Sequence, residues 1–131
     1  MARIFVVEDD APIRNEVIEV LERQGYEASY CLTFDHVVED ILAARPDLVL
    51  LDEPYSGLDP HAAELFDRLL ERVREGRTFV MVSHDLDKGY DLCTHALILA
   101  QGRVVVCANK DLIDREAFRE LYLATVGMGV A

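Results

Sequence analysis

The sequence predicts an α/β protein, in which a mostly parallel sheet carries helices on both faces and a C-terminal hairpin adds an antiparallel edge strand. Short β-branched runs alternate with amphipathic segments of helical spacing along the chain, and this alternation favours parallel strands. A length of 131 residues with 51% apolar residues fits a single domain with a substantial core. We therefore expect one α/β domain over residues 1–131.

The first half of the chain alternates strand, helix, strand, helix and strand. Asp10 can cap the first helix, Pro12 suits its first turn, and Gly25 ends it. Pro46 breaks the chain before the third strand. The expected strands are 3–9, 26–32 and 47–52. The expected apolar helix stripes are Ile13, Val17, Val20 and Leu21, and then Phe34, Val37, Val38, Ile41 and Leu42 behind a Thr33 cap.

The second half continues the alternation and ends in a hairpin. Gly76 ends a helix over 61–76, whose apolar stripe is Leu65, Leu69, Leu70 and Val73. Gln101-Gly102 separates two strand-like runs closely enough to form a hairpin. The remaining expected elements are a strand at 78–84, a short helix at 86–93, strands at 95–101 and 103–108, and a helix at 111–125.

Composition excludes several classes of function. The net charge of −12 argues against nucleic acid and anionic membrane surfaces as partners, because phosphate neutralisation needs clustered Lys and Arg. Cys31, Cys93 and Cys107 lack metal-ligand spacing and fit buried positions in a reduced compartment. No secretory signal and no bilayer-spanning run is visible. We expect a soluble, recombinantly expressed, cytoplasmic protein.

Acidic side chains follow two strands of the predicted sheet. Glu8 and Asp9 end the first strand, and Asp52 and Glu53 follow the third. The carboxyl ends of parallel strands meet at one edge of a sheet, where functional groups collect. Carboxylate oxygens suit Mg²⁺. We predict a weak Mg²⁺ site at Glu8, Asp9 and Asp52, although strand-end acids that only cap helices and face water are the alternative.

Residues 1–52 resemble a response-regulator receiver domain. The resemblance rests on "IFVVEDD", the helix, strand and helix that follow, and "PDLVLLD". It implies a three-layer, flavodoxin-like fold with strand order 2-1-3-4-5. It also implies that Glu8 and Asp9 help to bind Mg²⁺ and that Asp52 accepts a phosphoryl group.

Residues 48–131 resemble the C-terminal part of an ATP-binding cassette ATPase. The resemblance rests on "LVLLDEP", "SGLD", "VMVSHD" and "ALILAQGRVV". It implies that Asp52 holds Mg²⁺ through water, that Glu53 polarises the attacking water, and that His84 senses the γ-phosphate. It also implies that Asp59 reaches a partner subunit.

Each resemblance lacks a part of its chemistry. ATP hydrolysis needs a Gly-rich loop with its Lys, and no G-x-x-x-x-G-K-[ST] occurs in the sequence. The receiver pattern has Ser83 in place, but its usual Lys after the fifth strand is missing from "LILAQG". We therefore expect no ATP binding and no enzymatic activity, with Glu53 and His84 as vestigial residues.

These observations favour an engineered chimera that joins the two families through their common Asp-ending strand. Its expected purpose is a test of whether fragments of two folds share one core. The alternative is a phosphoryl-accepting receiver domain that uses Asp52. No cofactor is required in either case beyond weak Mg²⁺. We expect a monomer, or a weak homodimer formed through an exposed edge strand.

Overall fold

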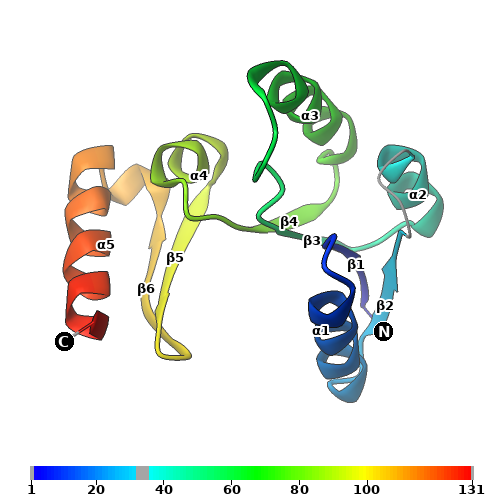
Figure 1. The fold of residues 1–131 in the computed structure, drawn as a ribbon, viewed down its shortest axis with the longest axis horizontal. Coiled ribbons are helices and arrows are strands. Elements are labelled where there is room, and N and C mark those ends of the chain that lie inside the picture. Colours follow the sequence, from blue (N-terminus) through cyan, green and yellow to red (C-terminus); the bar gives the residue numbers. More distant parts are fainter. Residues whose placement is uncertain (1, 32–35, 131) are drawn as a thin grey trace. The chain divides into compact units, whose positions relative to one another are not determined.

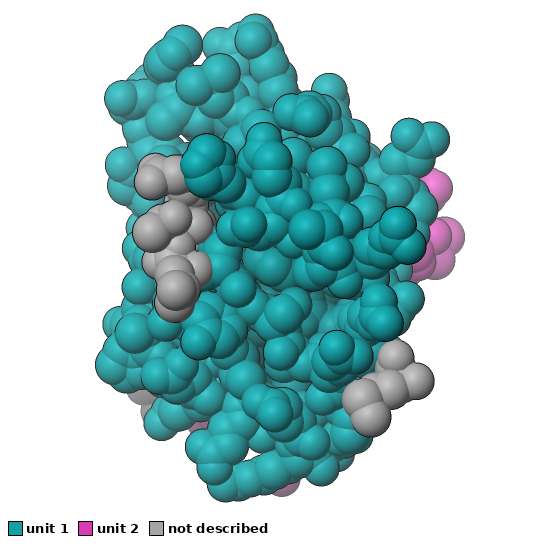
Figure 2. All heavy atoms as spheres, turned by 90° about the vertical axis from the view of Figure 1, so that its right-hand side faces the viewer, with its two compact units in different colours: residues 1–83 teal, residues 84–131 magenta. Residues whose placement is uncertain are grey.

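The computed structural model describes residues 2–31 and 36–130, and the side chains up to residue 125. The predicted cap Thr33 and the predicted apolar residue Phe34 lie outside the described residues. The chain forms two compact units, residues 1–83 and residues 84–131, coloured teal and magenta in Figure 2. A single cooperative domain over residues 1–131 stays a prediction.

Unit 1 contains the alternating elements expected from the sequence. Asp10 caps the first helix as predicted, accepting a hydrogen bond of 3.3 Å from the Ile13 N–H. Gly25 follows the helix with a φ of 89°, a left-handed conformation that suits a residue without a side chain. The elements are β1 (Arg3–Val7), α1 (Ala11–Arg23), β2 (Glu27–Tyr30), α2 (Val37–Ala44), β3 (Leu48–Asp52), α3 (Pro60–Val73) and β4 (Thr78–Val82).

The four strands of unit 1 form a parallel sheet in the order β2-β1-β3-β4. Val7 of β1 pairs with Leu51 of β3, and Leu51 pairs in turn with Met81 of β4. Helix α1 lies on one face of this sheet, and α2 and α3 lie on the other (Figure 1). The predicted three-layer α/β arrangement and the order of the first four strands therefore agree with the structure.

The core of unit 1 lies between the sheet and helices α2 and α3. Successive strand residues point to opposite faces, so alternate residues of β1 and β3 enter this layer. Val49 is fully buried and Phe5 is 2% exposed. The buried members of the cluster are Phe5, Val7, Cys31, Val37, Val38, Ile41, Val49, Leu51 and Val73. The strand ends that carry Glu8 and Asp52 are therefore fixed by a well-packed layer.

The buried faces of two helices differ from the predicted stripes. Ile13 of α1 is 44% exposed and Leu65 of α3 is 45% exposed. The predicted Leu69, Leu70 and Val73 of α3 do face the core, and Phe66 packs there in place of Leu65. The apolar pattern located each helix, but its rotation about its own axis depends on which residues meet the sheet.

Unit 2 contains the predicted hairpin. Strands β5 and β6 pair in antiparallel fashion, and Gln101 and Gly102 adopt positive φ values of 51° and 77° in the turn. Two successive positive φ values match the twist of a two-residue hairpin. The elements are α4 (Leu86–Leu92), β5 (His95–Ala100), β6 (Arg103–Asn109), a 3₁₀ turn (Lys110–Leu112) and α5 (Arg115–Val130).

The predicted fifth strand does not join the parallel sheet. Among the described residues, β5 and β6 form a two-stranded sheet with each other. The two-residue turn brings β6 beside β5, and the two strands pair with each other. The flavodoxin-like order 2-1-3-4-5 is therefore not confirmed.

Helices α4 and α5 of unit 2 are joined around Tyr90. Its hydroxyl donates a hydrogen bond of 2.8 Å to the Ile113 carbonyl, and its ring lies 5.9 Å from that of Phe118. Asp87 of α4 forms ion pairs with Arg115 at 3.1 Å and with Arg119 at 2.8 Å. These pairs lower the pKa of Asp87.

The three cysteines have different environments. Cys31 is buried, Cys93 is half-buried and Cys107 is exposed, so the prediction of buried cysteines is wrong for Cys107. Cys107 lies on the antiparallel hairpin, where one face of a strand can point to solvent. Within the described part of the chain, no helix combines the length and apolar character needed to cross a membrane.

Candidate functional site

The carboxyl ends of β1 and β3 bring Glu8 and Asp52 together. Val7 and Leu51 are paired in the parallel sheet, so the residues that follow them leave the same edge side by side. Glu8 is only 8% exposed and Asp52 is half-buried. The expected meeting of acids from two strands therefore occurs at this edge.

Asp52 perturbs the ionisation of Glu8. A side-chain hydrogen bond with Asp52 raises the pKa of Glu8, and burial raises it further. The Asp10 backbone N–H donates a hydrogen bond of 3.0 Å to Glu8 Oε1, which partly opposes the rise. The edge therefore holds carboxyl groups that resist simultaneous ionisation, a situation that a nearby cation would relieve.

Asp9 completes the predicted set of metal ligands. Its side chain acts on that of Glu8, where it partly opposes the rise in pKa, and Asp9 is exposed. Among the described residues, no group of three or more His, Cys, Asp or Glu side chains is arranged to hold a metal ion by itself. The structure places Glu8 beside both Asp9 and Asp52, and metal binding by these three residues stays a prediction.

Glu53 follows Asp52 in an unusual backbone conformation. Its φ is 48°, in the left-handed region that residues other than glycine rarely adopt. The Glu53 N–H donates a hydrogen bond of 2.8 Å to the Val82 carbonyl at the end of β4. The chain therefore turns sharply between Asp52 and Glu53, and the half-buried Glu53 is held at the strand ends.

The loop after Glu53 is anchored at the beginning of α3 and along it. Asp59 caps α3 through a hydrogen bond of 2.8 Å from the Ala62 N–H, and Pro60 occupies the first turn. The Tyr55 hydroxyl donates a hydrogen bond to Asp67 Oδ1. Burial, followed by this hydrogen bond, raises the pKa of Tyr55.

The contact between Tyr55 and Asp67 was not predicted from the sequence. One signal was available. Asp67 lies next to Phe66 and three residues before Leu70, on the apolar side of α3. A half-buried acid in an apolar stripe requires a polar partner.

His84 lies two residues beyond β4. It is exposed and belongs to unit 2. Asp85 follows it and caps α4, accepting a hydrogen bond of 3.1 Å from the Lys88 N–H. The structure thus places His84 in the short connection between β4 and α4.

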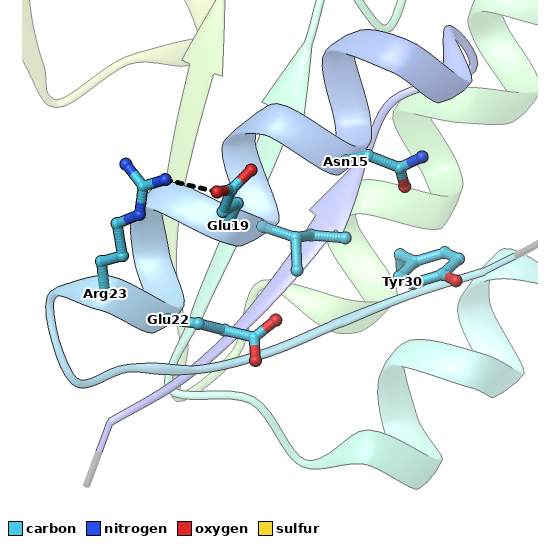
Figure 3. A pocket seen from close by; sticks show the side chains of 6 residues that line it. Asn15, Glu19, Glu22, Arg23 and Tyr30 are labelled. Atoms are coloured by element: carbon cyan, nitrogen blue, oxygen red, sulfur yellow. Dashed lines mark hydrogen bonds and ion pairs between the residues drawn. The ribbon is translucent and has the colours of Figure 1, made fainter.

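A shallow groove elsewhere on unit 1 contains none of the predicted site residues. It runs along α1 beside Tyr30 of β2, as Figure 3 shows. Arg23 and Glu19 form an ion pair at its edge. The residues that line it are Asn15, Ile18, Glu19, Glu22, Arg23 and Tyr30. The candidate site is therefore the acidic edge beyond β1 and β3.

Known proteins share sequence with this chain over the segment that carries the acidic edge. The profile of the family described as "AAA domain, putative AbiEii toxin, Type IV TA system" matches residues 40–87. A putative ABC transporter ATP-binding protein of Gloeobacter violaceus is 35% identical over 75% of this chain and 39% of its own length. An energy-coupling factor transporter ATP-binding protein of Clostridium perfringens is 29% identical over 89% of this chain and 46% of its own.

The likeness extends to solved structures. The cbiO1 protein of Clostridium perfringens, part of the ABC transporter complex cbiONQ, matches with a TM-score of 0.53 and 27% identity. The match covers 94% of this chain and 54% of that protein. The chain therefore spans about half, or less, of the proteins that it matches.

These findings correct the origin predicted for the chain. A chimera should match ATP-binding cassette proteins over its second part alone, yet single relatives match 89% and 94% of the chain. The engineered chimera and the receiver-domain alternative are therefore wrong. A strand that ends in Asp is common to both families, so short motifs in residues 1–52 could not separate them. The phosphoryl-acceptor role of Asp52 rested on the resemblance to a receiver domain, so it is no longer supported.

The predicted absence of activity and partners is also corrected. The expectations of no enzyme and no ATP binding are contradicted, since the relatives are ATP-binding proteins. The expectation of no membrane partner is contradicted, because these relatives are named as proteins of transporters. The expectation that no cofactor is required is unsupported, whereas weak Mg²⁺ binding is compatible with an ATP-binding protein.

Proposed function

We propose that this chain contributes to ATP hydrolysis in an ATP-binding cassette ATPase. The observation that carries the proposal is the sharp turn at Asp52 and Glu53, which presents two successive acids at the edge of a parallel sheet. Residues 40–87, the segment matched by the AAA-domain family profile, contain both acids and His84. This proposal replaces the interpretation of Glu53 and His84 as vestigial residues.

Three residues have distinct proposed roles. Glu53 orients the attacking water and accepts its proton as the water oxygen bonds to the γ-phosphorus, while the bond from that phosphorus to the bridging oxygen breaks and ADP leaves. Asp52 would help to hold Mg²⁺ beside the phosphates. His84 donates a hydrogen bond to the γ-phosphate and stabilises the charge that develops on it.

The acidic edge fits Mg²⁺ by its chemistry. Magnesium is usually bound by one or two carboxylates together with phosphate oxygens and retained waters, and a complete protein cage is not required. Glu8 and Asp52 supply adjacent carboxylates, and the raised pKa of Glu8 indicates a crowding of like charges that a cation reduces. When bound, the ion neutralises phosphate charge. Asp52 would hold it, with Glu8 and Asp9 beside it.

The phosphates require a further group. Backbone N–H groups of a Gly-rich loop and its Lys normally hold them, and the printed sequence contains no G-x-x-x-x-G-K-[ST]. We propose that this group is supplied from outside residues 1–131. On this proposal the chain contributes Asp52 and Glu53 to a composite site.

We also propose a transporter partner in a membrane, with the chain on its cytoplasmic side. The support is that the matching proteins are named as ATP-binding proteins of ABC transporters. A net charge of −12 does not favour direct binding to anionic lipid, so the contact is proposed to be with protein. The lack of a nucleic-acid partner stays a prediction.

Substitution of Glu53 tests the catalytic role. The parent and Glu53→Gln should bind Mg²⁺-ATP with similar affinity, measured by calorimetry, in the complex that supplies the phosphate loop. Hydrolysis should fall by roughly 10²- to 10⁴-fold in Glu53→Gln, because a general base is lost. Glu71→Gln, which removes an exposed acid from α3, is the matched control. Equal hydrolysis by the parent and Glu53→Gln, or no binding of ATP by the complex, would overturn the proposal.

A further inference from the structure

The loop over residues 53–59 holds Glu53 through a short chain of backbone contacts. The Glu53 N–H binds the Val82 carbonyl at 2.8 Å, and the Glu53 carbonyl accepts the Ser56 N–H at 3.1 Å. The Leu58 N–H then binds the Tyr55 carbonyl at 3.2 Å. A left-handed residue other than glycine persists only where its surroundings hold it. The conformation of Glu53 therefore depends on how well this loop is fixed.

Tyr55 joins the middle of this loop to α3 by two contacts. Its ring meets the edge of Phe66, with ring centres 5.0 Å apart and ring planes at 83°. Its hydroxyl donates a hydrogen bond to Asp67 Oδ1, one residue further along the helix. Both residues of the contact are half-buried, so the hydrogen bond is partly shielded from water.

We propose that Tyr55 is a positioning residue for Glu53, acting through its hydrogen bond to Asp67. The Asp59 cap fixes the end of the helix and the sheet fixes the end of the strand, and Tyr55 adds a side-chain anchor to the loop between them. Fixing Tyr55 fixes the Ser56 turn and, through it, the backbone of Glu53. The catalytic consequence rests on the role of Glu53 given under the proposed function.

A purely structural role for Tyr55 predicts a different pattern. If the contact only adds to the stability of unit 1, its loss should increase opening throughout the sheet. If it positions the loop, its loss should increase local opening of the loop while the sheet stays closed. Amide hydrogen exchange at individual residues separates the two cases.

The exchange experiment compares Tyr55→Phe with the parent. Phenylalanine retains the ring beside Phe66 and removes only the hydroxyl donor. We expect the Glu53 and Ser56 amides to exchange at least about tenfold faster, as for the loss of a hydrogen bond to a charged group. The Val49 and Leu51 amides of β3 should change by less than about twofold, since the sheet remains closed. Tyr26→Phe, at an exposed tyrosine, is the matched control.

Substitution of the acceptor gives an independent comparison. Asp67→Ala should reproduce the faster exchange of the loop, and Asp67→Asn, which keeps an acceptor oxygen, should restore most of the protection. Equal acceleration at Glu53 and Val49 would overturn the proposal, because it indicates global destabilisation. No acceleration at Glu53 in Tyr55→Phe would also overturn it.

Kinetics test the catalytic consequence. Tyr55→Phe should lower kcat for ATP hydrolysis by about tenfold and leave KM within about twofold, because the phosphates are held elsewhere. Faster loop exchange with an unchanged kcat would overturn the positioning role. If the parent complex hydrolyses no ATP, the proposed function fails, and exchange alone then decides whether Tyr55 holds the Glu53 backbone.

Discussion

The carboxyl groups of Glu8 and Asp52 interact across the ends of two parallel strands, and the interaction with Asp52 is the main cause that raises the pKa of Glu8. Two ionised carboxylates in this position repel each other, so a bound proton or a nearby cation relieves the repulsion. The pair therefore links proton binding, metal binding and folding stability at one edge of the sheet.

Asp52→Asn should stabilise the protein at neutral pH. The folded-state pKa of Glu8 is raised, so the folded state holds this proton more tightly than the unfolded chain does. Its stabilising contribution is complete below the ordinary pKa of about 4.3 and is lost as pH rises through the raised value. Asp52→Asn removes the main cause of the raised Glu8 pKa, so the melting temperature should increase at pH 7.

Thermal unfolding between pH 4 and pH 8 measures this difference. The difference in melting temperature between Asp52→Asn and the parent should become smaller as the pH approaches 4. At that pH the Glu8 carboxyl is mostly protonated in the folded and the unfolded chain. Glu71→Gln, an exposed acid elsewhere in unit 1, controls for the general reduction in negative charge. A difference in melting temperature that is independent of pH would contradict the assignment of Glu8 as the titrating group.

Magnesium should stabilise the folded chain weakly. With a dissociation constant on the order of 1 mM, ~10 mM Mg²⁺ adds roughly 1.4 kcal/mol by mass action. For a domain of this length the melting temperature should increase by about 3 to 5 °C. NaCl at matched ionic strength is the control for screening. Asp52→Asn should lose most of the response, and an unchanged response in that variant would count against the predicted site.

The cap of α3 should contribute measurably to stability. Asp59 accepts the Ala62 N–H at 2.8 Å, so Asp59→Ala leaves that donor without its cap. We expect the free energy of unfolding in urea to decrease by about 1 kcal/mol. Asp59→Asn keeps an acceptor oxygen, so its free energy of unfolding should decrease much less. Equal losses in the two variants would show that charge, and not the capping bond, is responsible.

Ile41→Ala tests whether the chain unfolds as one domain. Ile41 is 3% exposed in the core of unit 1, and its truncation should cost about 2 to 5 kcal/mol. If unfolding is cooperative over the whole chain, amides of β5 and β6 should lose protection to the same extent as those of β3. Unchanged protection in the hairpin would show that residues 84–131 unfold separately.

Local sequence patterns were sufficient to locate most elements. The β-branched runs gave β1, β3 and β4, and Asp10 and Gly25 marked the ends of α1 because caps and left-handed glycines act within one turn. The two residues Gln101-Gly102 predicted the hairpin for the same reason. The origin of the chain was predicted wrongly, since short motifs around a common Asp-ending strand do not distinguish two families.

The sequence by itself determined the alternation of strands and helices and the presence of acids where β1 and β3 end. Only the tertiary structure decided that Leu65 faces solvent, that β5 pairs with β6 alone among the described strands, and that Tyr55 binds Asp67. The reason is physical. Caps, turns and periodicity depend on residues a few positions apart, whereas helix rotation, strand pairing and side-chain contacts depend on which distant surfaces meet when the core closes.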